Sequence, residues 1–281
     1  MPTPRIVPLT AIGRPASLVA LAEAVFGVGD RRPGWFARKL LRECVDADLS
    51  HVAVTATGDP TDPQCWLGYV LVGTPPSLGS AARTAGTGVV EAARGRGIGT
   101  ALLAAAATAT RASGRTHLQL LSAPPRVGYY LRQHFTVVHR LVTLLRPSTG
   151  VVGAPLPGPQ PWAPSRPASR VLVQWLPEAW AHSDSRHTLV LPHATAHVSA
   201  EGRAWLVHRL VTHSATDTRL EARVIATADA LLRRLPQGHP VLLPLIEEVS
   251  RITAAWLAAG WHPIQRGTLL QLDLSQSWES R

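Results

Sequence analysis

Lysine is almost absent from this 281-residue sequence: Lys39 is the single lysine among 28 basic residues, and the others are arginine. With its many Ala, Gly and Pro residues, this composition is typical of a GC-rich genome, so the arginine excess alone is weak evidence for a phosphate site. Cysteine is scarce too. Cys44 and Cys65 stand in an apolar candidate helix and an apolar candidate strand, so we expect packing residues of a reduced, cytosolic protein.

Long apolar runs are also missing. No stretch of eighteen or more apolar residues occurs, and no basic-then-apolar leader opens the sequence. We therefore expect a cytoplasmic protein with neither a membrane span nor a secretory signal. A hydrophobic fraction of 46% still suffices for buried cores, and the length exceeds that of one usual domain, so two domains are expected.

A stretch rich in proline and glycine interrupts the regular patterns between Pro147 and Arg170. It cannot sustain a helix or a strand and is typical of a semi-rigid linker. We predict an N-terminal domain over 1–148, a linker over 149–169 and a second domain over 170–281. The first part carries 16 basic and 8 acidic residues against 12 and 10 in the remainder, which indicates an anionic partner for the N-terminal half.

Hydrophobic periodicity gives the order of elements in the N-terminal half. Strands are expected over 6–11, 49–57, 66–72, up to Glu91, over 117–122, and over 135–145 as one long or two short strands. Helices are expected after Ser17, from Pro33, over 97–113 and over 126–133. The order β-α-α-β-β-β-α-β-α-β-β predicts a mixed α/β fold.

The most informative segment is the run Arg94-Gly95-Arg96-Gly97-Ile98-Gly99-Thr100, which joins the β-branched strand end Val89-Val90 to a helix. Glycines allow backbone conformations that other residues avoid, and they allow a ligand to approach the main chain closely. The free N–H groups at the start of a helix, together with the helix dipole, can hold a pyrophosphate.

Two nucleotide-binding motifs do not fit this loop. The P-loop requires a lysine between its last glycine and a Ser or Thr, whereas Gly99 is followed directly by Thr100. The dinucleotide fingerprint requires a glycine at position 100 and an acidic residue about twenty residues later, and neither is present. A tight helix entry without a ligand is the remaining simple alternative.

The spacing Arg94-x-x-Gly97-x-Gly99 resembles the coenzyme-A loop of the GNAT acetyltransferase superfamily. The order of elements is similar to that fold over nearly all of residues 5–147. A second segment, Tyr129-Tyr130-Leu131-Arg132-Gln133-His134-Phe135, resembles the aromatic-Tyr pair and closing Gly-Phe of the same superfamily, with His134 in place of the glycine. The Asn and Ala usually found earlier in that helix are absent.

The resemblance implies a site for acetyl-CoA. Val89 and Val90 would pair with the pantetheine arm as a neighbouring strand does. Backbone N–H groups from Gly95 to Thr100 would hold the pyrophosphate, with charge added by Arg94 and Arg96.

The resemblance also implies that Tyr130 acts as general acid toward the leaving thiolate, because its ordinary pKa of about 10 suits that task. The general base stays open. Glu91 is the only acidic residue between Ala81 and Arg94. His117, His139 and a chain of waters are further candidates.

The second half looks like a shortened copy of the same fold. An ungapped alignment of Arg94 with Arg223 replaces Gly97 by Ala226 and Gly99 by Ala228. Farther on, Trp256 takes the place of Tyr130, and Gly260 takes that of His134. We therefore predict two tandem GNAT-like mixed-sheet domains, the second one shortened and unable to bind coenzyme.

Other residues of the second half have structural interpretations. The pairs His193/His197 and His208/His213 lack cysteine partners and favourable spacing, so we expect no metal. Glu247-Glu248 could hold a cationic acceptor or supply favourable charge to a helix N-terminus. Seven of the nine tryptophans lie beyond residue 149, where core packing is favoured over an acceptor cleft.

The leading hypothesis is an N-acetyltransferase that uses acetyl-CoA and acts on the amine of a small molecule or peptide, a class that includes natural products and antibiotics. The alternative is a non-catalytic acyl-CoA-binding regulatory module. A nucleic-acid partner is disfavoured because the basic residues lack interleaved aromatic residues. The acceptor, the acyl preference and the oligomeric state stay open.

Overall fold

The computed structural model describes residues 3–27, 33–160, 171–174, 177–183, 185–213 and 219–275. The chain forms two compact units. Unit 1 comprises Met1–Val138 and Leu269–Arg281, and unit 2 comprises His139–Thr268. None of the described helices has the length and the apolar character needed to cross a membrane.

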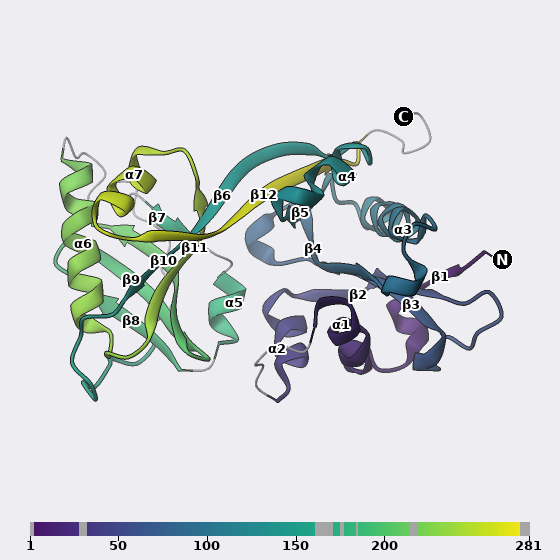
Figure 1. Cartoon of the computed structure of the whole chain (residues 1–281), viewed down its shortest axis with the longest axis horizontal. Coiled ribbons are helices and arrows are strands. Elements are labelled where there is room, and N and C mark those ends of the chain that lie inside the picture. The colour runs from purple at the N-terminus through teal and green to yellow at the C-terminus, as the bar shows by residue number, and fades with distance from the viewer. Residues whose placement is uncertain are drawn as a thin grey trace. The chain divides into compact units, whose positions relative to one another are not determined.

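Unit 1 is built on a mixed sheet (Figure 1), in which β4 and β5 are parallel and the pairs β1–β2, β2–β3 and β3–β4 are antiparallel. Its strand order is β1-β2-β3-β4-β5-β12-β6. The strands are β1 (Arg5–Pro8), β2 (Val45–Val54), β3 (Trp66–Gly73), β4 (Ala81–Val89), β5 (His117–Ser122), and the parts of β6 (Thr136–Pro147) and β12 (His262–Asp273) that belong to this unit.

Helices cover both faces of this sheet. The helices are α1 (Val19–Phe26), α2 (Trp35–Arg42), α3 (Ile98–Ala112) and α4 (Val127–Leu131). On one face, Leu102 and Leu103 of α3 pack against Val70 and Leu118. On the other face, apolar residues of α1 and α2 pack against the opposite side of β2 and β3. The predicted order of elements is therefore confirmed as far as β6, with shifted ends.

One inner position in the sheet of unit 1 is filled from a distant part of the sequence. The segment 135–145, expected as one strand or two, is the single strand β6, and β12 lies between β5 and β6. Leu270, Leu272 and Leu274 enter the core beneath α3, and the Leu274 N–H donates to the carbonyl of Thr116 at 2.9 Å. The helix that carries the glycine-rich loop therefore rests partly on residues 269–274.

The strand order in unit 2 is β12-β6-β11-β10-β9-β8, with β7 paired to β10. Its further strands are β7 (Val171–Gln174), β8 (Arg186–Val190), β9 (Ala194–Glu201), β10 (Ala204–Thr212) and β11 (Pro240–Glu247). Its helices are α5 (Pro177–Ala181), α6 (Leu220–Arg234) and α7 (Arg251–Ala258). Leu231 of α6 and Trp256 of α7 belong to one buried cluster with Val207 and Leu243 of the sheet.

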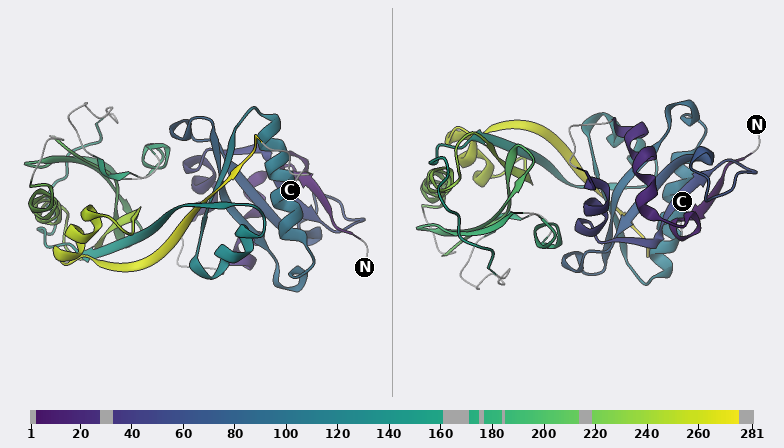
Figure 2. Two further views of the ribbon diagram at one scale, coloured as in Figure 1. Left: turned by 90° about the horizontal axis from the view of Figure 1, so that it is seen from above. Right: turned by 90° about the horizontal axis from the view of Figure 1, so that it is seen from below.

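The strands β6 and β12 lie side by side and each contributes residues to both units (Figure 2). The units thus divide after Val138 and after Thr268. Residues 148–160 form neither helix nor strand, as predicted, but they are hydrogen-bonded to unit 2: the Ser148 hydroxyl donates to the Leu235 carbonyl at 2.6 Å. Residues 161–170 lie outside the described residues, so the predicted linker and domain bounds stay predictions.

Three local expectations need correction. Cys44 follows α2 with a φ of 49°, and Cys65 closes a 3-10 turn before β3, so neither lies in its expected element. The thiol of Cys65 donates to Oδ2 of Asp62 at 3.7 Å. In the second half, Arg223, Ala226 and Ala228 lie inside α6 rather than at its start, so the ungapped alignment of the loops was wrong.

The counterpart of the α4 segment is confirmed by matching backbone geometry. The Phe135 N–H donates to the Tyr130 carbonyl at 3.2 Å, and the Trp261 N–H donates to the Trp256 carbonyl at 3.1 Å. The intervening residues His134 and Gly260 have φ values of 63° and 79°. Both segments thus end in the same left-handed turn, which glycine adopts more easily than histidine.

Candidate active site

The parallel strands at the centre of unit 1 separate after a short paired stretch. Ala81, Ala82 and Arg83 of β4 pair with His117, Leu118 and Gln119 of β5. Although β4 runs on to Val89 and β5 to Ser122, no further pairs join them in the described chain. Beyond Arg83, the edge of β4 that faces β5 therefore keeps N–H and C=O groups that another extended molecule can use.

The main-chain groups of Val89, the last residue of β4, and of Val90, which follows it, point to different edges of the strand. The Val90 N–H donates to the Leu67 carbonyl of β3 at 2.9 Å, so it is not available to a ligand, contrary to expectation. Because main-chain groups alternate along a strand, those of Val89 point to the opposite edge. There the Val89 carbonyl accepts a hydrogen bond from Nε of Arg94 at 3.1 Å.

The glycine-rich loop is exposed and open. After the 3-10 turn Glu91–Ala93, the residues from Arg94 to Gly97 lie at the surface, and α3 begins at Ile98. Gly95 and Gly97 both have a φ of 75°, and a Cβ built on either residue would meet no atom within 4 Å. These glycines are therefore required by the backbone conformation, and they leave open space in front of the loop.

The start of α3 can receive an anion. Gly97 is the N-cap, and no side chain of the described residues caps it. The N–H groups of Ile98, Gly99 and Thr100 lie in the first turn, where a helix offers them no internal acceptor. A helix of 15 residues adds the positive end of its dipole. Together with the exposed Arg94 and Arg96, these groups fit the charge and geometry of a diphosphate.

Tyr130 is half-buried in the apolar cluster of α4. Its ring packs edge-to-face on Tyr129, with centroids 5.0 Å apart, and on Phe135, with centroids 6.0 Å apart. Burial raises the pKa of Tyr130 above its ordinary value; Tyr129 adds to the rise and Arg126 opposes it. The phenol therefore stays protonated at neutral pH and can serve as a proton donor.

Tyr129, which the sequence analysis did not select, is the tyrosine in contact with the start of α3. Its hydroxyl lies 3.5 Å from Oγ1 of Thr100. A Cβ built on Gly99 would stand 2.9 Å from the same hydroxyl. Gly99 needs no left-handed conformation, so its lack of a side chain is explained by this close approach. In the sequence, the glycine at position 99 was the one sign that a large side chain lies close to the first turn of α3.

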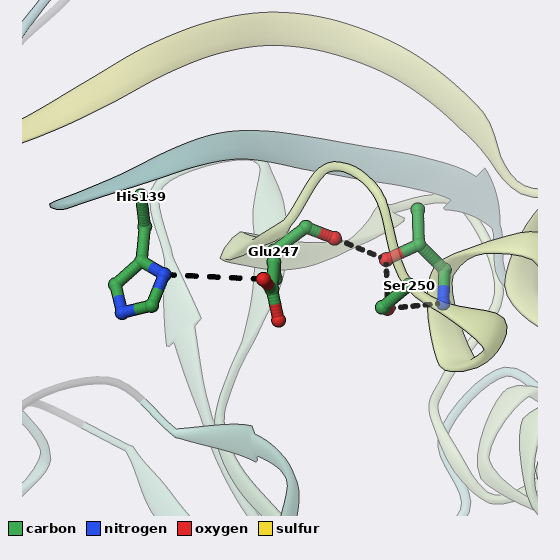
Figure 3. Close-up of polar contacts among 4 residues, drawn as sticks. His139, Glu247 and Ser250 are labelled. Carbon is green, nitrogen blue, oxygen red and sulfur yellow. Dashed lines mark hydrogen bonds and ion pairs between the residues drawn. The ribbon is translucent and has the colours of Figure 1, made fainter. Parts of the chain in front are cut away.

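The candidate bases lie on three different elements. Glu91 is exposed at the first position of the 3-10 turn. His117 is half-buried on β5, with Nδ1 2.8 Å from Oγ1 of Thr116. His139 belongs to unit 2, where its Nδ1 lies 3.9 Å from Oε1 of Glu247, and both side chains are at least half exposed (Figure 3).

The acidic pair Glu247-Glu248 precedes α7, whose first turn holds no acidic residue. Figure 3 shows that Ser250 caps this helix: its hydroxyl accepts the N–H of Thr253 at 3.0 Å. The Thr253 hydroxyl in turn donates to the backbone carbonyl of Glu247. The carboxylate of Glu248 accepts a hydrogen bond from Nε of Arg266 at 2.5 Å.

A row of polar side chains crosses the sheet where β4 and β5 part. Arg83 donates through Nη2 to Oε1 of Gln119 at 3.1 Å, and Gln119 donates through Nε2 to Oε1 of Gln271 at 3.0 Å. Burial lowers the pKa of Arg83, an effect partly offset by Glu43, and the guanidinium remains charged. The sequence pattern does not reveal this row, because Gln271 belongs to β12, far along the chain from Arg83 and Gln119.

This row lies on the sheet face opposite α3. The adjacent residues Ala82, Leu118 and Leu270 pack in the core beneath α3, and successive side chains of a strand alternate between faces. The described residues contain no cluster of three or more His, Cys, Asp or Glu side chains that could hold a metal ion. The tryptophans described in unit 2, namely Trp180, Trp205, Trp256 and Trp261, are buried, as core packing predicts.

Solved structures of acetyltransferases share this architecture. A putative acetyltransferase of Pyrococcus horikoshii is similar over 96% of this chain and 89% of its own, with 14% identity and a TM-score of 0.59. A GCN5-related N-acetyltransferase of Sphaerobacter thermophilus is similar over 97% and 95%, with 13% identity and a TM-score of 0.58.

A tandem GNAT protein from the clavulanic acid biosynthesis pathway is similar over 98% of this chain and all of its own, with 15% identity and a TM-score of 0.55. No model of a protein family matches the sequence, and no curated protein matches it either. At these identities the likeness concerns the fold, and it extends over nearly the whole chain, including both units. The chain therefore has the tandem GNAT acetyltransferase fold.

Proposed function

We propose that this chain is an N-acetyltransferase that uses acetyl-CoA and acetylates the amine of a small molecule or a peptide. The observation that carries the proposal is the separation of β4 from β5 beside an exposed glycine-rich loop at the start of α3. The open edge of β4 fits an extended pantetheine arm, and the loop fits a diphosphate. Their succession along one chain segment matches the succession of those two groups in coenzyme A.

The residues of the loop divide the work of binding. Backbone N–H groups from Gly95 to Thr100, among them that of Ile98, would hold the diphosphate, and Arg96 would add charge without a fixed position. Arg94 bonds to the Val89 carbonyl, so its guanidinium would both brace the loop and neutralise phosphate. The main chain of Val89 would pair with the pantetheine arm, whereas that of Val90 is already paired with β3.

When bound, the coenzyme supplies a thioester whose carbonyl carbon accepts an amine. Tyr130 would then give its proton to the departing sulfur, for which a protonated phenol is a suitable donor. Tyr129 would contact the coenzyme between the loop and α4. Glu91 would accept a proton from the amine through a water, because its carboxylate is exposed.

The acceptor class includes natural products and antibiotics. A protein of similar fold comes from the clavulanic acid pathway, which supports this class but names no acceptor for the present chain. The row Arg83–Gln119–Gln271 would lie on the acceptor side of the thioester, since the coenzyme loop belongs to the other sheet face.

The proposal is tested by thiol release. Purified chain is incubated with acetyl-CoA and a panel of amines, namely aminoglycosides, amino acids, polyamines and short peptides, and free coenzyme A is titrated. Release that depends on one amine and acetylation of that amine in the mass spectrum support the proposal. Absence of release with every amine, in the presence of measured coenzyme binding, contradicts it.

The alternative is a non-catalytic acyl-CoA-binding module, and one observation favours it. Tyr130 is half-buried among apolar rings while Glu91 is exposed, so the two proposed proton-transfer groups are not visibly poised together. In that case the same loop would bind the coenzyme. Replacing Tyr130 by Phe would leave coenzyme binding unchanged, and no thiol release would depend on Tyr130.

A further inference from the structure

The strand β10 of unit 2 holds the same central position as β4 of unit 1. β4 ends the antiparallel run β1-β2-β3-β4, and β10 ends the antiparallel run β8-β9-β10; each is then parallel to the next strand, β5 or β11. The parallel pairing is short in both: Trp205 and Leu206 of β10 pair with Val241 and Leu242 of β11, and no later pair joins these strands in the described chain. Unit 2 therefore has the same separation of central strands that forms the proposed coenzyme site in unit 1.

In unit 2 this separation is filled. Beyond Leu206, β7 pairs antiparallel with β10 through Arg209, Leu210 and Val211. The other edge of β10 is already taken, because β9 pairs with the same three residues. A strand has only two edges, so β7 lies on the side of β11, which it also contacts.

We infer that Val171–Gln174 is an internal ligand of unit 2, a segment of the chain itself that occupies the place which the pantetheine arm takes in unit 1. This inference rests on the proposed function for the site in unit 1. An extended polypeptide and a pantetheine arm both offer amide N–H and C=O groups to a strand edge, so either can satisfy the main chain of β10.

A second feature of unit 2 agrees with this assignment. The seven residues that precede α6, from His213 to Arg219, contain no glycine. The loop before α3 contains Gly95 and Gly97, both of which need their left-handed conformation. Unit 2 therefore lacks the residues that would form a phosphate cradle in front of the filled edge. That this half binds no coenzyme stays a prediction, and it no longer depends on the ungapped alignment.

The consequence is that the two units have different ligands. Unit 1 leaves its β4 edge open to a soluble molecule, whereas unit 2 has its ligand covalently attached. Unit 2 would then be held closed at all times, and the chain would bind one coenzyme.

Amide hydrogen exchange tests this inference on the full chain, with and without coenzyme A. We expect the amides of 209–211 to be strongly protected without ligand and unchanged after its addition. The amides of 84–89 in unit 1 serve as the internal comparison and should exchange more slowly with coenzyme bound. Rapid exchange over 209–211 without ligand, or slower exchange there on addition of coenzyme, overturns the inference.

This design separates the inference from the function on which it rests. Unchanged exchange over 84–89 with saturating coenzyme would contradict the proposed function, whereas the role assigned to β7 depends only on the exchange of 209–211. Calorimetry measures in addition the number of coenzyme molecules bound per chain. One per chain agrees with the inference, and two per chain overturn it.

A variant with matched control extends the test. Because main-chain groups alternate along a strand, replacement of Val171–Gln174 by Gly-Ser-Gly-Ser should raise at least tenfold the exchange rate of those amides of 209–211 that point toward β7, and it should leave the coenzyme affinity of unit 1 unchanged. The same replacement of residues 151–154, a surface stretch outside any helix or strand, should change neither. Equal exchange at 209–211 in both variants overturns the inference. If the first variant does not fold, the exchange pattern of the unaltered chain decides.

Discussion

The hydroxyl of Tyr129 lies directly over Gly99, so that a Cβ on this glycine would stand 2.9 Å from the phenol oxygen. The same oxygen is 3.5 Å from Oγ1 of Thr100. The helix α4 therefore packs against the first turn of α3, and the two tyrosines of α4 face different tasks: Tyr129 contacts the loop, while Tyr130 contacts Phe135.

Substitution of the two tyrosines separates these tasks. Tyr130→Phe removes the proposed proton donor, so kcat should fall by roughly 100-fold or more while the Kd of the coenzyme stays within about twofold. Tyr129→Phe removes a hydroxyl beside the loop and should weaken coenzyme binding several-fold with a smaller effect on kcat. Steady-state kinetics give kcat, and calorimetry gives the Kd of the coenzyme. A large loss of kcat in Tyr129→Phe with weakened binding in Tyr130→Phe would show that the two residues have the opposite roles.

A double-mutant cycle tests the contact itself. Gly99→Ala forces a methyl group against the Tyr129 hydroxyl and should cost about 1–3 kcal/mol of unfolding free energy. Part of this loss should return in Gly99→Ala/Tyr129→Phe, because the obstructing oxygen is gone. Gly97→Ala is the matched control: its Cβ is free of contacts, so its cost of about 1 kcal/mol arises from the left-handed backbone and should not respond to Tyr129→Phe. Equal recovery in both backgrounds contradicts the packing explanation.

The pH dependence of turnover reports on Tyr130. A general acid must be protonated, and burial raises its pKa, so kcat should hold through neutral pH and decline only above the ordinary pKa of tyrosine. Arg126 lowers this pKa, so Arg126→Gln should move the alkaline limb to still higher pH. An alkaline limb that stays in place in the variant would show that Arg126 does not act on the titrating group.

A buried histidine gives unit 2 an acid-sensitive stability. His197 is 4% exposed, and burial, assisted by Arg209, lowers its pKa to about 4. An unfolded histidine binds a proton near pH 6.5, so the unfolded state takes up more protons between these values and stability falls as the pH decreases from 6.5 to 4. The loss should be about 2–3 kcal/mol in chemical denaturation. His197→Gln should flatten this slope, and His193→Gln, at an exposed position, should not.

β12 supports α3, the helix that follows the glycine-rich loop. Leu270 and Leu272 are buried beneath α3, so Leu272→Ala should cost about 2–5 kcal/mol and reduce coenzyme binding as unit 1 loosens. Leu257→Ala removes a side chain that is 44% exposed in unit 2 and should change stability by less than about 1 kcal/mol. Undiminished coenzyme binding in Leu272→Ala at temperatures near its melting point would contradict this coupling.

Much of the site could be predicted because its signals are local. The passage from Val89 through Gly95 and Gly97 into α3 depends on neighbouring residues, whose conformational preferences appear in the sequence itself. The aromatic pair before Phe135 is local as well. Hydrophobic periodicity and glycine spacing thus placed β4, α3 and α4 near their observed positions.

What could not be predicted depends on distant contacts or on repetition. Gln271 and Leu272 pair with residues about 150 positions away, and their alternating pattern would suit any sheet with one polar face. The second loop was misplaced because an apolar helix face returns every turn, so Leu231-Leu232 matches Leu102-Leu103 equally well when the helix start is displaced. Tyr129 escaped notice because only the packed structure places its hydroxyl over Gly99.

The most direct test of the central claim is a crystal structure of the chain with acetyl-CoA. The account predicts a single coenzyme, its diphosphate bonded to the N–H groups between Gly95 and Thr100, its pantetheine arm along β4, and its sulfur nearer to Tyr130 than to any residue of unit 2. A coenzyme bound elsewhere, or a diphosphate held only by surface arginines with the loop unoccupied, would contradict it.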